Sequence, residues 1–198
     1  MENYNNQIGP LEVIVGPMFA GKTEELIRRA KRLDYAHKQY LVFKPKIDNR
    51  YSDTDVVSHN KKALKAIPID KIEDIEKFIE PKTEAIIIDE VQFFKGNVKE
   101  FVKKLQTLGL RVIAGGLDMD FRGEPFGIIG DLLSMADEVL KLTAICSVCG
   151  ENASRTQRII GGMPAYYDDP IVLVGEKESY EPRCRCHHIV LFGKKNEQ

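Results

Sequence analysis

Residues 16 to 23 combine two glycines, a lysine and a hydroxyl group at a spacing suited to phosphate chemistry. They read Gly-Pro-Met-Phe-Ala-Gly-Lys-Thr and match the pattern G-x-x-x-x-G-K-[ST]. The glycines of such a loop allow a tight backbone path, so that successive N–H groups surround a polyphosphate. The lysine contacts the β- and γ-phosphates, and the hydroxyl binds Mg²⁺. We expect ATP and Mg²⁺ at Gly16, Pro17, Met18, Phe19, Ala20, Gly21, Lys22 and Thr23.

Two adjacent carboxylates follow a second apolar run. Residues 85 to 90 read Ala-Ile-Ile-Ile-Asp-Glu, so Asp89 stands where a buried strand ends. A phosphate-binding loop needs such a carboxylate to hold its metal, directly or through water. Glu90 beside it suits a general base toward water or a substrate hydroxyl. The alternative for both residues, and more so for Glu90, is an ordinary polar strand end.

Cysteine and histidine form two clusters near the C-terminus. Cys146-x-x-Cys149 precedes a glycine, and Cys184-Arg-Cys-His-His188 follows after about 35 residues, which suits one tetrahedral Zn²⁺ site. The x₂ spacing favours Cys184 and His187 as the second pair, with Cys186 and His188 as possible substitutes. Four such ligands leave no open position, so the zinc should be structural. The alternative is a set of unpaired buried thiols.

Strands and helices alternate over about the first 145 residues, which predicts an α/β fold. Such alternation implies a mainly parallel sheet with helices on both faces. The strands are expected at residues 11–15, 40–43, 85–88 and 110–114. The helices are expected at residues 22–33, 71–80, 96–108 and 127–140.

The character of the chain changes after Ala144. Cysteines appear for the first time, helical periodicity fades, and Gly-Gly and Asp-Asp-Pro breaks interrupt the chain. We predict a nucleotide-binding domain over residues 1–145 and a small zinc-binding domain over residues 146–198. Residues 194–198 are polar, and we expect them to fray.

The charge balance argues against a nucleic-acid or membrane-surface binder. The 198 residues include 29 basic and 30 acidic ones, for a net charge of −1, and 43% are hydrophobic. No apolar run approaches the ~20 residues of a membrane span, and the polar N-terminus is unlike a signal peptide. We expect a cytoplasmic protein whose four cysteines form no disulfides.

Together these motifs resemble those of the type II thymidine kinases, over about residues 11 to 190. Besides the loop, the acidic pair and the cysteine pairs, the resemblance rests on several further segments. They are Phe43-Lys-Pro-Lys-Ile-Asp-Asn-Arg-Tyr51, Val57-Ser-His59, Val91-Gln-Phe-Phe94, Gly116-Leu-Asp-Met-Asp-Phe121 and Glu178-Ser-Tyr-Glu-Pro182.

The resemblance implies a fold, a reaction and an assembly. The fold is a RecA-like α/β domain plus a small zinc-held domain, whose lasso loop folds over the nucleoside. The reaction transfers the γ-phosphoryl group of ATP to the 5′-hydroxyl of thymidine, and of deoxyuridine, in pyrimidine salvage. Members are usually tetramers, and dTTP is expected to inhibit as the end product.

Roles follow for single positions from the same resemblance. Glu90 would be the general base, Asp89 and Thr23 would organise Mg²⁺, and Lys22 would contact the transferring phosphate. Arg50 would clamp phosphoryl charge, and Gln92 would belong to the cofactor site. The thymidine pocket would be lined by Phe121, Tyr180 and the lasso residues Ile171, Val172, Leu173, Val174 and Gly175.

The chain departs from the family pattern at one zinc ligand, and two other functions are alternatives to a thymidine kinase. The family often ends its zinc site with Cys-x-x-Cys, whereas this chain offers Cys184-x-x-His187. A Cys₃His site is chemically sound. One rival is a P-loop ATPase with a zinc ribbon that acts on nucleic acid, although the zinc region has no dense basic–aromatic stripe. The other is a regulatory nucleotide-binding protein without turnover.

Overall fold

A six-stranded, fully parallel sheet forms the centre of the computed structural model, which describes residues 8–46, 55–57, 63–172 and 178–193. The strand order is β5-β2-β6-β7-β1-β8. The strands are β1 (Leu11–Val15), β2 (Tyr40–Pro45), β5 (Ile67–Ile69), β6 (Ala85–Ile88), β7 (Arg111–Gly116) and β8 (Glu138–Lys141). The predicted α/β fold class is confirmed.

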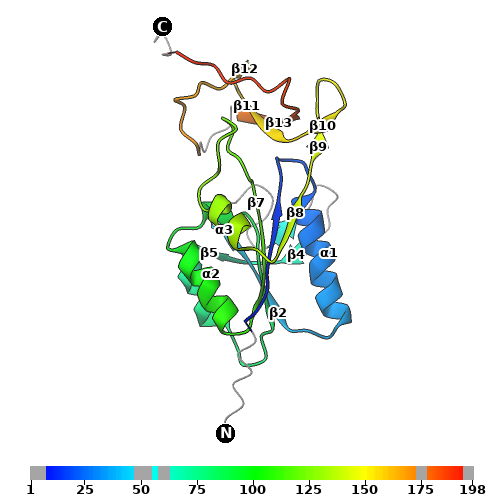
Figure 1. Ribbon diagram of the computed structural model, residues 1–198, viewed down its shortest axis with the longest axis vertical. Coiled ribbons are helices and arrows are strands. Elements are labelled where there is room, and N and C mark those ends of the chain that lie inside the picture. Colours follow the sequence, from blue (N-terminus) through cyan, green and yellow to red (C-terminus); the bar gives the residue numbers. More distant parts are fainter. Residues whose placement is uncertain (1–7, 47–54, 58–62, 173–177, 194–198) are drawn as a thin grey trace.

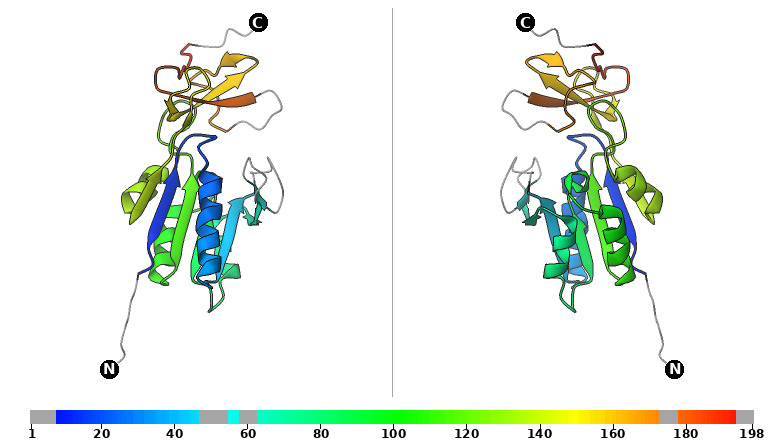
Figure 2. Two further views of the ribbon diagram at one scale, coloured as in Figure 1. Left: turned by 90° about the vertical axis from the view of Figure 1, so that its right-hand side faces the viewer. Right: turned by 90° about the vertical axis from the view of Figure 1, so that its left-hand side faces the viewer.

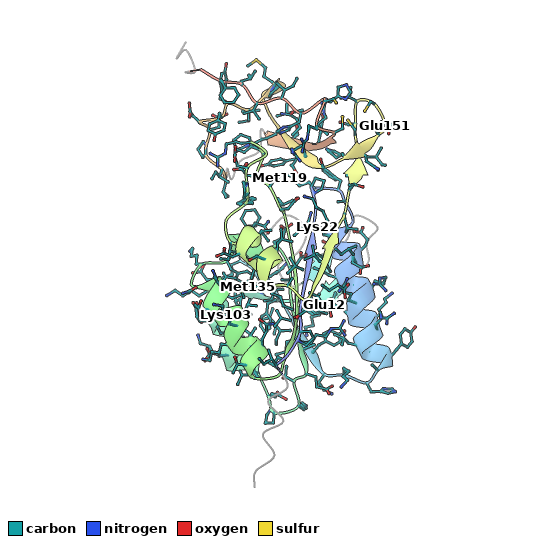
Figure 3. The ribbon with its side chains drawn as sticks, viewed as in Figure 1. Glu12, Lys22, Lys103, Met119, Met135 and Glu151 are labelled. Atoms are coloured by element: carbon teal, nitrogen blue, oxygen red, sulfur yellow. The ribbon has the colours of Figure 1, made fainter. Side chains whose placement is uncertain are left out.

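Helices cover both faces of this sheet (Figure 1). On one face, α1 (Lys22–Tyr35) packs Leu26, Ala30 and Leu33 against alternate strand residues such as Ile14 and Ile87. On the other lie α2 (Val98–Thr107), α3 (Ile129–Met135) and the 3₁₀ helix η1 (Ile72–Phe78). Figure 3 shows side chains filling both layers. Parallel sheets need this double cover, because their strands are apolar on both faces.

The strands β9 to β13, called the smaller strands below, lie beyond the carboxyl ends of the large sheet in the views of both Figure 1 and Figure 2. One hairpin pairs β9 (Ala144–Ile145) with β10 (Asn152–Ala153). A three-stranded antiparallel sheet has the order β12-β11-β13 and comprises Met163–Pro164, Arg155–Ile160 and Glu178–Arg183. A separate hairpin joins β3 (Asp55–Val57) to β4 (Ala63–Lys65). The predicted domain boundary after residue 145 stays a prediction.

Two predicted helices differ from the structure. The helix expected over 127–140 is wrong in its second half, because α3 ends at Met135 and β8 pairs with β1 at the sheet edge. Asp137 fixes this turn, since its carboxylate accepts from Leu11 N at 2.8 Å. The helix expected over 71–80 is a 3₁₀ helix, and its apolar residues Ile72, Ile75 and Phe78 recur every three residues, the period of that helix.

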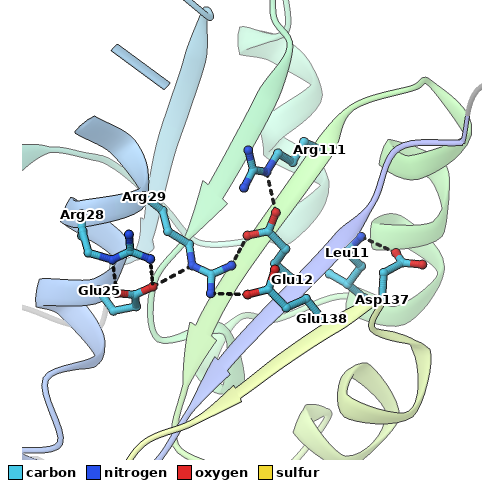
Figure 4. Close-up of polar contacts among 8 residues, drawn as sticks. All are labelled: Leu11, Glu12, Glu25, Arg28, Arg29, Arg111, Asp137 and Glu138. Atoms are coloured by element: carbon cyan, nitrogen blue, oxygen red, sulfur yellow. Dashed lines mark hydrogen bonds and ion pairs between the residues drawn. The ribbon is translucent and has the colours of Figure 1, made fainter. Parts of the chain in front are cut away.

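A buried ion-pair network ties α1 to three strands (Figure 4). The guanidinium of Arg29, 6% exposed, contacts Glu12 of β1, Glu25 of α1 and Glu138 of β8. Arg111 of β7 also contacts Glu12, at 2.5 Å. Burial alone would lower the pKa of Arg29, but the three carboxylates outweigh it and raise that pKa. The network holds α1, and hence the loop before it, in a fixed position on the sheet.

Replacing Arg29 with Met should therefore destabilise the fold. The substitution keeps the apolar stem but leaves the buried Glu12 with only one of its two arginine partners. We expect the free energy of unfolding in urea to fall by about 3 kcal/mol, the scale of a broken buried ion pair. The control is Arg28→Met on the preceding residue, whose exposed pair with Glu25 should contribute much less. Equal losses in the two variants would contradict a structural role for the network.

Candidate active site and metal centre

The phosphate-binding loop occupies the turn between β1 and α1, and both of its glycines are required there. Gly16 has φ 154°, and a Cβ on it would lie 2.6 Å from the carbonyl oxygen of Leu142. Gly21, with φ 82°, is left-handed and immediately precedes α1. Any side chain would be strained at both positions. The helix that follows directs its N-terminal N–H groups at the space that the loop encloses.

The lysine of the loop is held inside it. Lys22 is 7% exposed, and its Nζ donates to the carbonyl oxygen of Pro17 at 2.7 Å. Figure 3 labels Lys22 at the end of the sheet nearest the smaller strands. The backbone N–H of Met18 donates to Oγ1 of Thr156, a buried residue of β11, at 3.0 Å. A hydrogen bond therefore connects the loop to the smaller strands.

Asp89 and Thr23 meet across the sheet. Asp89 directly follows β6, is 4% exposed, and places its Oδ2 3.4 Å from Oγ1 of Thr23 at the start of α1. Strand β7 lies between β6 and β1, so the contact passes over its end. A hydroxyl and a carboxylate are the oxygen ligands that Mg²⁺ takes beside a nucleotide. These two residues fit the metal expected from the sequence.

Glu90 adopts a left-handed conformation, with φ 49° and ψ 45°. This conformation costs a residue other than glycine about 1–3 kcal/mol, and residues that adopt it are enriched at functional sites. The backbone N–H of Glu90 donates to Oδ1 of Asp89 at 2.9 Å, and its Oε2 accepts from Nε2 of Gln92 at 2.5 Å. Glu90 is partly exposed, unlike the neighbouring Asp89. A carboxylate held in this way is able to accept a proton from a bound hydroxyl group.

Sequence reasoning gave no structural role to the two glycines that end β7, although Gly116 begins one of the segments on which the family resemblance rests. A Cβ on Gly115 would lie 2.8 Å from Cδ1 of Leu26 and 3.4 Å from Oδ1 of Asp89. A Cβ on Gly116 would lie 2.3 Å from Oε1 of Gln92. The missing side chains thus leave room for Leu26 of α1 at Gly115 and for Gln92, which follows β6, at Gly116. A pair of glycines inside an apolar strand run is the signal that could have identified this close approach.

The aromatic residues predicted to line a nucleoside pocket are neighbours of Arg158. Phe121 is 4% exposed, and the guanidinium of Arg158 lies 5.1 Å from its ring centroid. Tyr180 of β13 pairs with Arg158 of β11 across the small sheet. Arg158 is fully buried, and its Nη1 donates to the carbonyl oxygen of Pro170 at 2.5 Å. The structure therefore brings Phe121 and Tyr180 to one arginine that sequence reasoning did not single out.

The predicted lasso begins directly after Pro170. Ile171 and Val172 are 41% and 43% exposed. Leu173, Val174 and Gly175 lie outside the described residues, as does Arg50. For these four positions the sequence-based roles stay predictions.

Four ligand atoms converge as the cysteine spacing predicted. Those of Cys146, Cys149, Cys184 and His187 all lie within 4.8 Å of one another. Nδ1 of His187 is 3.2 Å from Cys184 Sγ and 3.8 Å from Cys146 Sγ, and the sulfurs of Cys149 and Cys184 are 3.8 Å apart. Ligands about 2.0–2.3 Å from a tetrahedral zinc are separated by about 3.3–3.8 Å. The four residues therefore fit Zn²⁺.

The other two candidate ligands lie outside this cluster. Cys186 is exposed, and Nε2 of His188 is 2.8 Å from the carbonyl oxygen of Phe121. Within the cluster, the surroundings of Cys146 favour the thiolate that a metal needs. Burial raises the pKa of the Cys146 thiol, but hydrogen bonds from the backbone of Cys184, Val148 and Cys149 outweigh it and lower the pKa to about 6.

Metal analysis should find about one zinc per chain, because the cluster offers four ligands and no open position. Replacing Cys146 with Ser should remove most of this zinc and lower the melting temperature, since metal binding contributes directly to folding. Cys186→Ser, next to the proposed ligand His187 but outside the cluster, is the matched control and should keep its zinc. Full zinc content in the Cys146 variant, or zinc loss in the Cys186 variant, would show that the ligands are assigned wrongly.

Comparison with known proteins places the chain in a family. A solved structure, the cytoplasmic domain of the Thermomonospora curvata type VII secretion ATPase EccC, is similar at 14% sequence identity and a TM-score of 0.43. The match covers 89% of this chain and 24% of that one, so the chain spans less than a third of the matched structure. The thymidine kinase family matches residues 9–188, which is most of the sequence and includes all of the site residues above. The chain belongs to the thymidine kinase family.

Proposed function

We propose that this kinase transfers the γ-phosphoryl group of ATP to the 5′-hydroxyl of thymidine, giving dTMP and ADP. Family membership supports a kinase that uses ATP and a nucleoside. The observation that carries the specific proposal is the placement of Glu90 directly after Asp89, whose carboxylate contacts Thr23 of the phosphate-binding loop. A metal-binding pair and a candidate base thereby share one end of the sheet.

Each part of the site has a task in this reaction. The loop N–H groups and Lys22 would hold the phosphates, and Thr23 and Asp89 would hold Mg²⁺, which neutralises charge on the β- and γ-phosphates. Glu90 would take the proton of the 5′-hydroxyl as its oxygen bonds to the γ-phosphorus. The bond from that phosphorus to the bridging oxygen breaks, and ADP leaves. Precise placement of these groups supplies most of the rate in phosphoryl transfer.

The smaller strands would bind the nucleoside. Phe121, Tyr180 and the segment from Ile171 to Gly175 are proposed to enclose thymidine, or deoxyuridine, with backbone groups facing the base. Closure of this segment would exclude water from the reacting phosphate. The hydrogen bond from Met18 to Thr156 supports such an arrangement, because it joins the loop to β11. Inhibition by dTTP would follow if its nucleoside portion occupied the same pocket.

Cellular setting and assembly belong to the proposal as well. Among the residues that the structure describes, no helix has the length and apolar character needed to cross a membrane. We propose a cytoplasmic enzyme of pyrimidine salvage that forms a homo-oligomer, a tetramer by family resemblance. The net charge of −1 supports an enzyme that does not depend on nucleic acid.

The direct test is conversion of thymidine to dTMP with ATP and Mg²⁺, with deoxycytidine and deoxyadenosine assayed in parallel. We expect turnover of thymidine and little of the other two, because a base pocket built from backbone groups reads the thymine edge. Failure to phosphorylate any nucleoside, despite ATP binding, would contradict the proposed reaction. Hydrolysis of ATP that DNA stimulates would instead favour an ATPase that acts on nucleic acid.

Glu90→Gln tests the base. The amide keeps the size of the side chain but accepts no proton, so we expect kcat to fall about 10²-fold or more with little change in ATP affinity. Glu84→Gln is a suitable control, because Glu84 precedes β6 at the opposite end of the sheet and pairs with Lys38 at the surface. An unchanged kcat in the Glu90 variant would rule out this assignment.

A further inference from the structure

The side chain of Gln92 joins the ends of two strands. Its Nε2 donates to Oε2 of Glu90 at 2.5 Å, and its Oε1 accepts from the backbone N–H of Leu117 at 3.2 Å. Glu90 follows β6, and Leu117 follows the neighbouring β7. One amide therefore connects the candidate base to the backbone at the end of the adjacent strand.

These two partners fix which way the amide faces. An ionised carboxylate only accepts hydrogen bonds, so the NH₂ group must face Glu90. A backbone N–H only donates, so the carbonyl oxygen must face Leu117. Both ends of the amide are thus used, and a half-turn of the group would break both bonds. This reciprocal arrangement restricts the carboxylate more than a single surface contact would.

Gly116 provides the space for this amide. A Cβ at that position would lie 2.3 Å from Oε1 of Gln92, well inside contact distance, and 3.0 Å from Cδ1 of Ile129. The backbone of Gly116 does not have a positive φ, so the clash, and not the conformation, is what excludes a side chain. An alanine there would displace the amide more readily than the strand, because the amide is the far end of a flexible side chain.

We propose that Gln92 is a positioning residue that holds the Glu90 carboxylate toward its substrate, and that Gly116 is required because it admits the Gln92 amide. This inference rests on the proposed function, since it assumes that Glu90 is the base. It differs from the role implied by family resemblance, in which Gln92 contacts the cofactor. In the structure the amide is directed at Glu90 and Leu117.

The test compares Gln92→Ala and Gly116→Ala with the wild-type enzyme. A hydrogen bond to a charged group is worth about 10- to 100-fold, so we expect kcat to fall by that amount in Gln92→Ala and by a similar or smaller amount in Gly116→Ala. The KM for ATP should not change. Gly130→Ala in α3, where a Cβ would meet nothing within 4 Å, is the matched control and should keep full activity.

A double substitution separates positioning from a general effect on the fold. If Gln92 acts only through the Glu90 carboxylate, then Gln92→Ala should cost little further kcat in the Glu90→Gln background. Melting temperatures of all variants identify any loss of folded protein. A further 10-fold loss in that background, or a raised KM for ATP with unchanged kcat, would overturn the inference.

Failure of the inference is distinguishable from failure of the proposed function. If the wild-type enzyme phosphorylates no nucleoside, both the proposed function and the positioning role of Gln92 are contradicted. If turnover depends on Glu90 but not on Gln92 or Gly116, only the positioning role is contradicted. Turnover that depends on all three, with Gly130→Ala fully active, supports both.

Discussion

The contact between Thr23 and Asp89 sets the geometry on which the rest of the site depends. These residues follow β1 and β6, which are separated by β7, so their side chains must meet over the end of that strand. The glycines that end β7 leave space beside this contact, since a Cβ on Gly115 would lie 3.4 Å from Oδ1 of Asp89 and a Cβ on Gly116 would lie 2.3 Å from Oε1 of Gln92. The parallel sheet gathers the strand ends at one edge, and the glycines keep the middle of that edge open.

Hydrogen bonds join the smaller strands and the segment after them to this end of the sheet. Met18 in the phosphate-binding loop donates to Thr156, and His188, next to a proposed zinc ligand, is within hydrogen-bond distance of the backbone of Phe121. The described residues after Ala144 include no helix, and their apolar cluster is small. This region therefore needs another source of stability, which a zinc ion bound by four ligands would supply. The proposed zinc site would therefore act on the proposed reaction indirectly, by fixing the strands that face the loop.

Sequence reasoning was accurate where a local pattern determines the structure. The apolar, β-branched runs at residues 11–15 and 85–88 became β1 and β6 with the expected bounds, and the cysteine spacing gave the four-residue cluster. It failed at β8, because pairing with β1 depends on contacts between residues more than 120 positions apart, such as Asp137 with Leu11. Sequence reasoning also gave no role to Gly116 and Arg158, whose importance depends on neighbours that only the folded chain supplies.

The left-handed backbone of Glu90 gives two adjacent carboxylates different surroundings, which suits the different roles proposed for them. In a continuing strand, neighbouring side chains would point to opposite faces of the sheet. Asp89 is still held by the sheet, since its N–H donates to the carbonyl oxygen of Phe43 at 2.9 Å. At Glu90 the chain turns, and Phe93 N closes the turn by donating to Glu90 O at 3.0 Å. A glycine would relieve the strain but would remove the carboxylate, so a glutamate at this position is best explained by the chemistry of its side chain.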